Sequence, residues 1–143
     1  MSVREDIAVN LVTTLKEINS IKPVLVTREP FDVEKLAITQ FPAILVTSTN
    51  EERNTETMSA GIRSGIITYT IRAFVRGNEL DTKRNDIIEA IEEALDADRN
   101  RGQGRGVVLD TQTVSVEVIE RLPPIAEAVL TVNVNYIFRR GTA

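Results

Sequence analysis

The sequence predicts an α+β fold, a mostly antiparallel sheet of about four to five strands with two amphipathic helices packed on it, in the order α-β-β-β-α-β-β. Three observations predict this fold. Two segments repeat apolar residues at helical spacing, two long segments alternate apolar with polar residues, and turn-forming residues separate them. The 143 residues show no internal repeat and no second pattern, so we expect one domain over residues 1–143.

The first helix is expected over residues 3–19, because Ser2 and Glu5 have the spacing of a capping box. Its apolar positions form a stripe wide enough to lie on a sheet. The members of the stripe are Ile7, Leu11, Leu15 and Ile18. The second helix is expected to begin after Asn78 as its N-cap and to end near Ala97, before the glycines that follow.

The strands are expected over residues 24–27, 43–46, 62–76, 107–122 and 126–139. The segment 43–46 is apolar on both faces, which indicates a central strand. In the strands over residues 62–76 and 126–139, alternation assigns one face to the core. The inward residues are Ile67, Tyr69, Ile71, Ala73 and Val75, and then Ala128, Leu130, Val132, Val134, Tyr136 and Phe138.

The sequence also predicts the structure of two segments that connect strands. Residues 32–38 are expected to form one or two helical turns capped by Asp32, and the pair Phe41-Pro42 ends them. Residues 47–61 are polar and too long for a tight hairpin, and loops of this length are usually functional or mobile.

Composition excludes several function classes. The chain has no Cys and no His, so it lacks a thiol nucleophile, a disulfide framework, the commonest general base and the commonest metal ligand. It has no Trp, four Phe and two Tyr, which argues against stacking platforms for single-stranded nucleic acid. The net charge of −4 argues against attraction to DNA or an anionic membrane. No apolar run could span a bilayer, and without a signal peptide we expect folding in a cytoplasm.

A sharp change in charge marks the end of the second helix. Residues 79–98 hold eight acids and two bases, whereas residues 99–105 hold three arginines and no acid. The glycines at 102, 104 and 106 do not match a phosphate cradle, because they follow a helix and precede a strand. A flexible connection is favoured there. For the three arginines, a solvated loop, a protein interface and contact with nucleic acid stay open.

The acidic residues do not form a recognisable site. Glu92, Glu93, Asp96 and Asp98 lack the loop spacing and glycine of a calcium site, and Glu51 and Glu52 have the same status. No serine or threonine can be paired with a histidine. We therefore assign no catalytic residue, no cofactor-binding residue, no metal ligand and no cofactor, and we expect a protein that is not an enzyme.

The order of the elements and the residue pattern of the strands resemble those of the tail terminator (tail completion, neck) proteins of long-tailed bacteriophages. The resemblance is carried by the layout of nearly the whole chain, including residues 71–75, 85–95 and 130–138. It implies a structural virion protein, an α+β subunit of a hexameric ring that caps the tail tube, ends its growth and joins tail to head. The implied partners are copies of itself, the tail-tube protein, head–tail connector proteins and, transiently, DNA in the channel, with no membrane. The implied location is the tail or neck of a virion assembled in a host cytoplasm.

A ring needs two different patches that meet head to tail, which fits the charge pattern. We expect nine residues to contact a neighbouring subunit or the lumen. They are Arg99, Arg101, Arg105, Glu89, Glu92, Glu93, Glu51, Glu52 and Arg53. Acids of the second helix or of residues 47–61 would face bases of the next subunit, and the arginine loop would meet DNA or the tube end. The alternatives are a head–tail connector, a tail-tube subunit, a nucleic-acid-binding module and a small enzyme that uses carboxylates alone.

Overall fold

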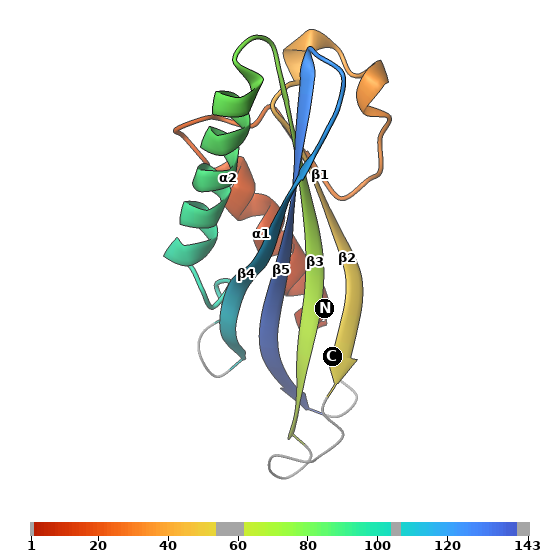
Figure 1. Ribbon diagram of the computed structural model, residues 1–143. Helices are drawn as coiled ribbons and strands as arrows, with labels where there is room; N and C mark the ends of the chain where they lie inside the picture. The colour runs from red at the N-terminus through yellow and green to blue at the C-terminus, as the bar shows by residue number, and fades with distance from the viewer. Residues whose placement is uncertain (1, 54–61, 104–106, 140–143) are drawn as a thin grey trace.

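The computed structural model describes residues 2–53, 62–103 and 107–139 and contains two α-helices and a five-stranded sheet (Figure 1). The strand order is β1-β2-β3-β5-β4, with β1 parallel to β2 and every other pair antiparallel. The predicted fold class and element order are confirmed. The bounds are α1 Val3–Lys16, β1 Leu25–Thr27, β2 Ala43–Arg53, β3 Ile62–Arg76, α2 Leu80–Ala97, β4 Val108–Ile119 and β5 Ile125–Arg139.

Both helices pack on one face of the sheet, which we call the helix face (Figure 1). β3 and β5 form its centre, and their register places Ile71 beside Leu130 and Tyr69 beside Val132. The inward residues predicted from alternation are buried, so that prediction is confirmed. They meet the apolar stripes of both helices, whose central members are Ile7, Leu11, Leu15, Ile87, Ile91 and Leu95.

On the other side of the sheet, which we call the open face, no α-helix lies among the described residues. One end of it is covered by residues 31–41, which include two short 3-10 helices, Val33–Lys35 and Ile38–Gln40. The rings of Phe31 and Phe74 meet edge to face there, with centroids 5.6 Å apart. The rest is largely polar, although Ile66 is exposed there, and the Thr68 hydroxyl donates to the Asn133 side chain at 2.9 Å.

The residues that cap and end the two helices could be predicted from the sequence only in part. Ser2 caps α1 as predicted, accepting from the Glu5 amide at 3.1 Å, but α1 ends at Lys16. The prediction that Asn78 caps α2 was wrong. Glu79 occupies that position with φ 53, because the turn out of β3 places its sharp bend there after Gly77. α2 ends at Ala97 as predicted, and neither helix is long and apolar enough to cross a membrane.

The polar stretch after residue 46 was predicted as a loop, and for residues 47–53 this was wrong. They continue β2, pairing with β3 from Thr47 beside Thr70 to Arg53 beside Gly65. Pairing with a long neighbouring strand overrides the weak strand preference of these polar residues. β2 lies between β1 and β3 and is therefore central, as predicted. Residues 54–61 lie outside the described residues. Asp32 caps its short helix as predicted, accepting from the Glu34 amide at 3.1 Å.

Candidate functional site

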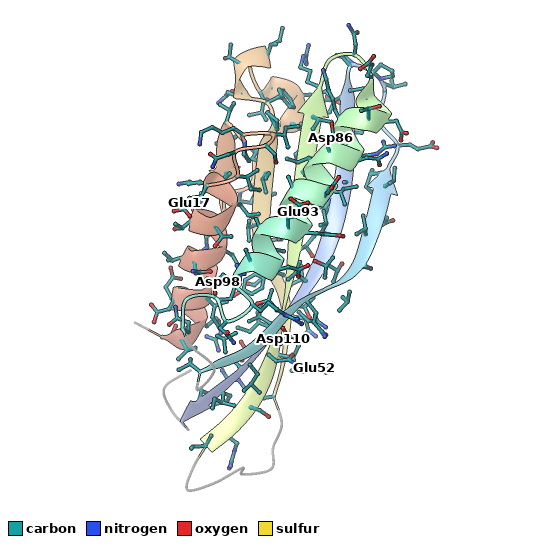
Figure 2. The ribbon with its side chains drawn as sticks, turned by 90° about the vertical axis from the view of Figure 1, so that its left-hand side faces the viewer. Glu17, Glu52, Asp86, Glu93, Asp98 and Asp110 are labelled. Atoms are coloured by element: carbon teal, nitrogen blue, oxygen red, sulfur yellow. The ribbon has the colours of Figure 1, made fainter. Side chains whose placement is uncertain are left out.

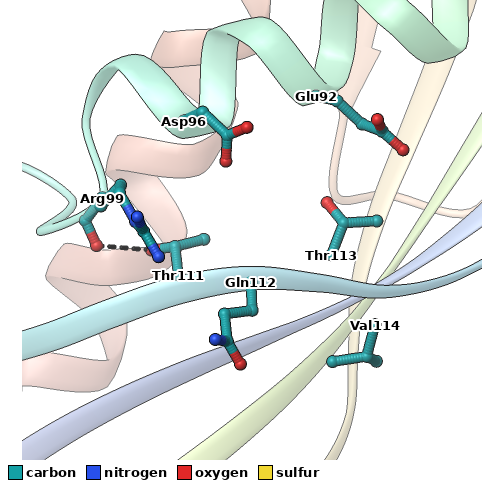
Figure 3. Close-up of a pocket in the computed structure, with 7 residues that line it drawn as sticks. All are labelled: Glu92, Asp96, Arg99, Thr111, Gln112, Thr113 and Val114. Carbon is teal, nitrogen blue, oxygen red and sulfur yellow. Dashed lines mark hydrogen bonds between the residues drawn. The ribbon is translucent and has the colours of Figure 1, made fainter.

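The acids of α2 form two rows on different sides of the helix. One row, Asp86, Glu89 and Glu93, lines a shallow hollow with Ser20 and Ile21, and Figure 2 shows Asp86 and Glu93 on the helical side of the molecule. The other row, Glu92 and Asp96, points from α2 toward β4 (Figure 3). None of these five carboxylates forms an ion pair with a residue that the structure describes. α2 therefore presents uncompensated negative charge in two directions.

An open groove of about 590 Å³ separates α2 from β4. Glu92 and Asp96 line it from the helix, Arg99 lies at one end, and residues 111–114 line it from the strand (Figure 3). The groove is open to solvent and does not form the deep pocket that carboxylate catalysis would need. Within residues 2–53, 62–103 and 107–139, no group of three acids could hold a metal ion.

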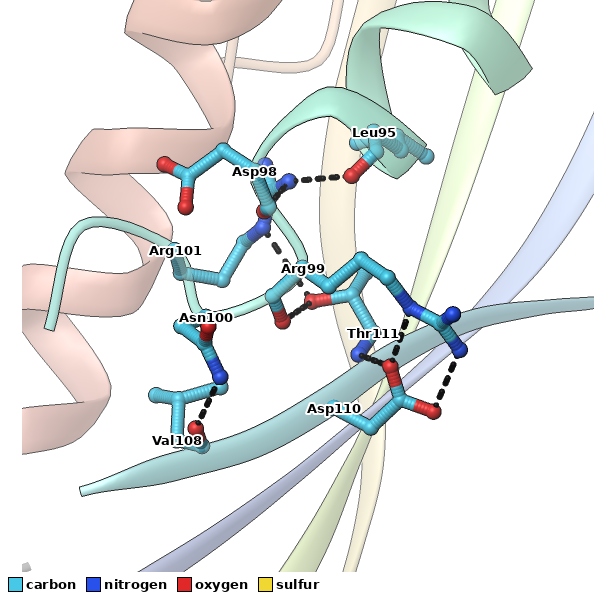
Figure 4. A network of polar contacts seen from close by, with 8 residues as sticks. All are labelled: Leu95, Asp98, Arg99, Asn100, Arg101, Val108, Asp110 and Thr111. Atoms are coloured by element: carbon cyan, nitrogen blue, oxygen red, sulfur yellow. Dashed lines mark hydrogen bonds and ion pairs between the residues drawn. The ribbon is translucent and has the colours of Figure 1, made fainter. Parts of the chain in front are cut away.

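Arg99 was predicted to contact a neighbour or the lumen, and its side chain is exposed. It is nevertheless matched inside the subunit, because Nε and Nη2 donate to the two carboxylate oxygens of Asp110 at 2.7 and 2.9 Å (Figure 4). The guanidinium lowers the pKa of the Asp110 carboxyl by this hydrogen bonding. Arg99 thus offers a surface group whose charge is already compensated.

Arg101 is fully buried, so its assignment as an interface or lumen contact is not supported. Nη2 donates to the carbonyls of Leu95, at 2.6 Å, and of Asp98, while Nε donates to the Thr111 hydroxyl at 3.1 Å (Figure 4). Nη1 donates to the Asn10 side chain on α1 at 3.3 Å. The guanidinium satisfies the last carbonyls of α2 and ties that helix to α1 and β4. Arg105, the third arginine, lies outside the described residues.

Glu51 also uses its charge within the subunit. Its carboxylate accepts from Arg4 at 2.7 Å, from Arg53 at 2.6 Å and from the Tyr136 hydroxyl at 2.8 Å. Burial alone would raise the pKa of Glu51, but these three hydrogen bonds lower it to about 2. The cluster fastens the start of α1 to β2. Arg53 also lies over the Phe138 ring, 4.7 Å from its centroid. Glu52 is exposed and borders a smaller hollow beside Tyr136.

Lowering the pH should remove the stabilisation that Glu51 provides. Because its pKa is depressed from 4.5 to about 2, the contribution is present above about pH 4.5 and is lost as the pH falls toward about 2. Solvent screening of this partly exposed site leaves about 1 to 2 kcal/mol. Urea unfolding of wild type and Glu51→Gln should therefore differ at pH 6 and converge near pH 2. Glu52→Gln is the matched control on the same strand. It keeps Glu51 and should retain the wild-type pH dependence, so a pH dependence reduced as much as in Glu51→Gln would contradict this assignment.

Sequence reasoning missed a charged cluster around Glu127 on the open face. Glu127 on β5 is only 2% exposed and accepts from Arg72 at 2.9 Å and from Arg121 at 2.6 Å. Arg121 lies over the ring of Phe74, and Arg76 lies over the ring of Phe41. Alternation placed Glu127 on the outward side of β5, which suggested exposure. No sequence signal indicated that Arg121, from the β4–β5 connection, would cover it.

The open face therefore gathers bases from β3 and from the β4–β5 connection. Two arginines share the Glu127 carboxylate, and Arg76 adds a third base nearby. The acid Glu117 is exposed at the β4 margin of this face. Bases on the open face and unpaired acids on α2 consequently lie on opposite sides of the sheet.

No family model matches the sequence, and no curated protein matches it. Among solved structures, the chain is similar to one in a structure described as the virion of a native gene transfer agent (GTA) particle. The two chains are 8% identical and have a TM-score of 0.50, and the match covers 96% of this chain and 96% of that chain. At this identity, the likeness concerns the fold.

Proposed function

We propose that this chain is a structural subunit of a virion, which forms a ring that caps the tail tube, ends its growth and joins tail to head. The observation that carries the proposal is the likeness in fold to a chain of a virion particle, over 96% of both chains. The tail terminator layout inferred from the sequence supports the more specific role. The separation of unpaired acids on α2 from bases on the open face supports self-assembly.

A ring requires a heterologous interface, in which two different patches of the same subunit meet head to tail. The row Asp86, Glu89 and Glu93 is a suitable acidic patch, because it is exposed and has no ion pair with a described residue. On the far side of the sheet, Arg72 and Arg121 share the single Glu127 carboxylate and Arg76 adds another base, so this side keeps net positive charge for the opposing patch. Charges arranged in this way set register and partner choice more than affinity. We expect six subunits per ring from the tail terminator resemblance.

Contact between the arginine loop and DNA in the channel has less support than the subunit contact. Of its arginines among the described residues, Arg101 is buried and Arg99 is paired with Asp110. We therefore place the ring contact on α2 and the open face. A head–tail connector or a tail-tube subunit could use the same two patches, and electron microscopy separates rings from tubes.

The test measures particle mass and shape at low and high salt. Wild type should form closed rings at low salt, visible by negative-stain electron microscopy, that dissociate as salt screens the contact. Reversing two acids in Glu89→Lys/Glu93→Lys should weaken assembly by at least about tenfold, and adding Arg76→Glu should restore part of it. Glu17→Lys is the control, since it reverses an exposed acid at the end of α1 that belongs to neither proposed patch.

Three results would each count against a different part of the proposal. A wild-type protein that stays monomeric at every concentration and salt level rules out self-assembly by the isolated chain. Rings that persist equally in Glu89→Lys/Glu93→Lys and in the control reject only the assignment of the acidic row. Tubes in place of rings favour the tail-tube alternative.

A further inference from the structure

β4 is a long strand at the end of the sheet, and only β5 pairs with it in the described part of the chain. It runs over Val108–Ile119, whereas β1, at the opposite end, covers only Leu25–Thr27. The main-chain N–H and C=O groups along the outer edge of β4 thus have no strand partner among these residues. An open edge of this length is a template to which an extended peptide can add as a further strand.

The side chains of β4 do little to block such pairing. Val114, Val116 and Val118 are 50%, 41% and 48% exposed. Edge strands that must stay unpaired commonly carry Lys or Pro, and Val108–Ile119 contains no Lys, Arg or Pro. Two register shifts interrupt its pairing with β5, but residues 115–119 after the second shift pair regularly. This regular portion holds two of the exposed valines.

Val116, Val118 and the groove acids lie on the same side of the sheet. Val116 pairs with Leu130 and Val118 pairs with Ala128, and both of these partners face the helices. Glu92 and Asp96 reach from α2 toward the earlier part of β4, as Figure 3 shows. A strand added to the outer edge would therefore place alternate side chains beside the valines at one end and near the two carboxylates at the other.

Charge decides which kind of strand fits. Neither Glu92 nor Asp96 forms an ion pair with a described residue, and Arg99, at the end of the groove, is paired with Asp110. A second copy joined through its own β4 would offer these acids no base, because Val108–Ile119 contains no Lys or Arg. A segment with basic side chains gains attraction at the same place.

We propose that β4 binds an extended segment of another protein as an additional strand, with basic side chains facing Glu92 and Asp96 and apolar side chains facing Val116 and Val118. The occupant is a strand of different sequence, not a second copy of this chain. The site does not depend on ring formation, because it uses the other row of α2 acids and a sheet edge that the ring contact leaves free.

The probe is a synthetic peptide of about ten residues, the length of a typical strand or slightly more, made in both sequence directions. One of its faces carries two lysines and two valines. A matched peptide carries glutamates in place of the lysines. Fluorescence anisotropy measures affinity, and hydrogen exchange locates protection. The lysine peptide should bind at least about tenfold more tightly than the glutamate peptide at low salt and should protect amides of Val108–Ile119.

Variants separate the two parts of the site. Glu92→Gln/Asp96→Asn should remove the preference for the lysine peptide, whereas Asp86→Asn/Glu89→Gln, on the other row, should leave most of it. Val116→Lys should weaken binding by about tenfold or more. Its control is Val24→Lys, because Val24 is an exposed valine beside β1 at the opposite sheet edge.

Several outcomes would overturn the inference. Equal affinity for the two peptides would remove the role of the groove acids, and protection outside β4 would move the site elsewhere. If Val116→Lys changes the mass of the protein without peptide, a second copy occupies the edge and the proposal is wrong. Ring formation is measured separately, so rings without peptide binding reject this inference alone, and peptide binding without rings rejects only the ring.

Discussion

Replacing Arg101 with leucine should lower the free energy of unfolding by about 2 to 4 kcal/mol. The guanidinium is fully buried and donates to two main-chain carbonyls at the end of α2 and to the Thr111 hydroxyl. Leucine fills part of the space but removes the guanidinium donors. The buried carbonyls of Leu95 and Asp98 would each keep only one main-chain hydrogen bond, from the amides of residues 98 and 101 at 3.3 Å.

The backbone at Arg101 supports this magnitude. Its φ of 51 is in the left-handed region, where a residue with a Cβ loses about 1 kcal/mol or more. This strained conformation occurs at a position where one side chain forms hydrogen bonds with α2, α1 and β4. The hydrogen bonds made by the guanidinium must outweigh the strain for the conformation to persist.

Urea unfolding followed by circular dichroism measures the effect. Arg99→Leu is the matched control, two residues away in the same loop, and should change stability only slightly because Arg99 is exposed. Arg101→Lys should recover part of the loss, since an ammonium cannot reach all the acceptors of a forked guanidinium. If Arg101→Leu keeps wild-type stability but impairs assembly, the interface role predicted from sequence would be right after all.

The fold could be predicted because its pattern is repeated over long segments. The alternation in β3 and β5 and the helical spacing in α1 and α2 each depend on burial against the same core, so many residues carry the same signal. The second half of β2 and the start of α2 could not be predicted in this way. A polar strand is specified by its partner, and the bend at Glu79 by the path of the chain out of β3.

The sequence shows which charged residues gather on α2 and in the loop after it, but it does not show which charges pair with one another. The acids of α2 and the arginines after it stand out in the sequence, but it does not show which charges are compensated within the subunit. Arg4 lies 47 residues from Glu51, and Arg72 lies 55 residues from Glu127, so only the folded sheet brings these pairs together. Arg101 shows the same limit, because nothing in a glycine-rich arginine loop indicates that one guanidinium turns inward.

Removing both arginines that hold Glu127 should be the most destabilising surface change on the open face. In Arg72→Gln/Arg121→Gln, a carboxylate that is 2% exposed loses both of its cationic partners. An uncompensated buried charge of this kind lowers the free energy of unfolding by about 3 to 5 kcal/mol. The reverse change, Glu127→Gln, should lower it by only about 1 to 2 kcal/mol, because the arginine side chains are 45% and 31% exposed and can turn to water.

This asymmetry distinguishes a buried acid held by two bases from an ordinary surface ion pair. In an ordinary surface pair, both variants would lower the free energy of unfolding only slightly. Chemical unfolding of the two variants measures it, with Glu117→Gln as the control on the same face. The same proteins also test the ring contact. Glu127→Gln makes the open face more basic, so its folded fraction should assemble at least as well as wild type at low salt, whereas loss of Arg72 should weaken assembly. If the two variants assemble alike at equal folded fraction, the bases of the open face do not form the opposing patch.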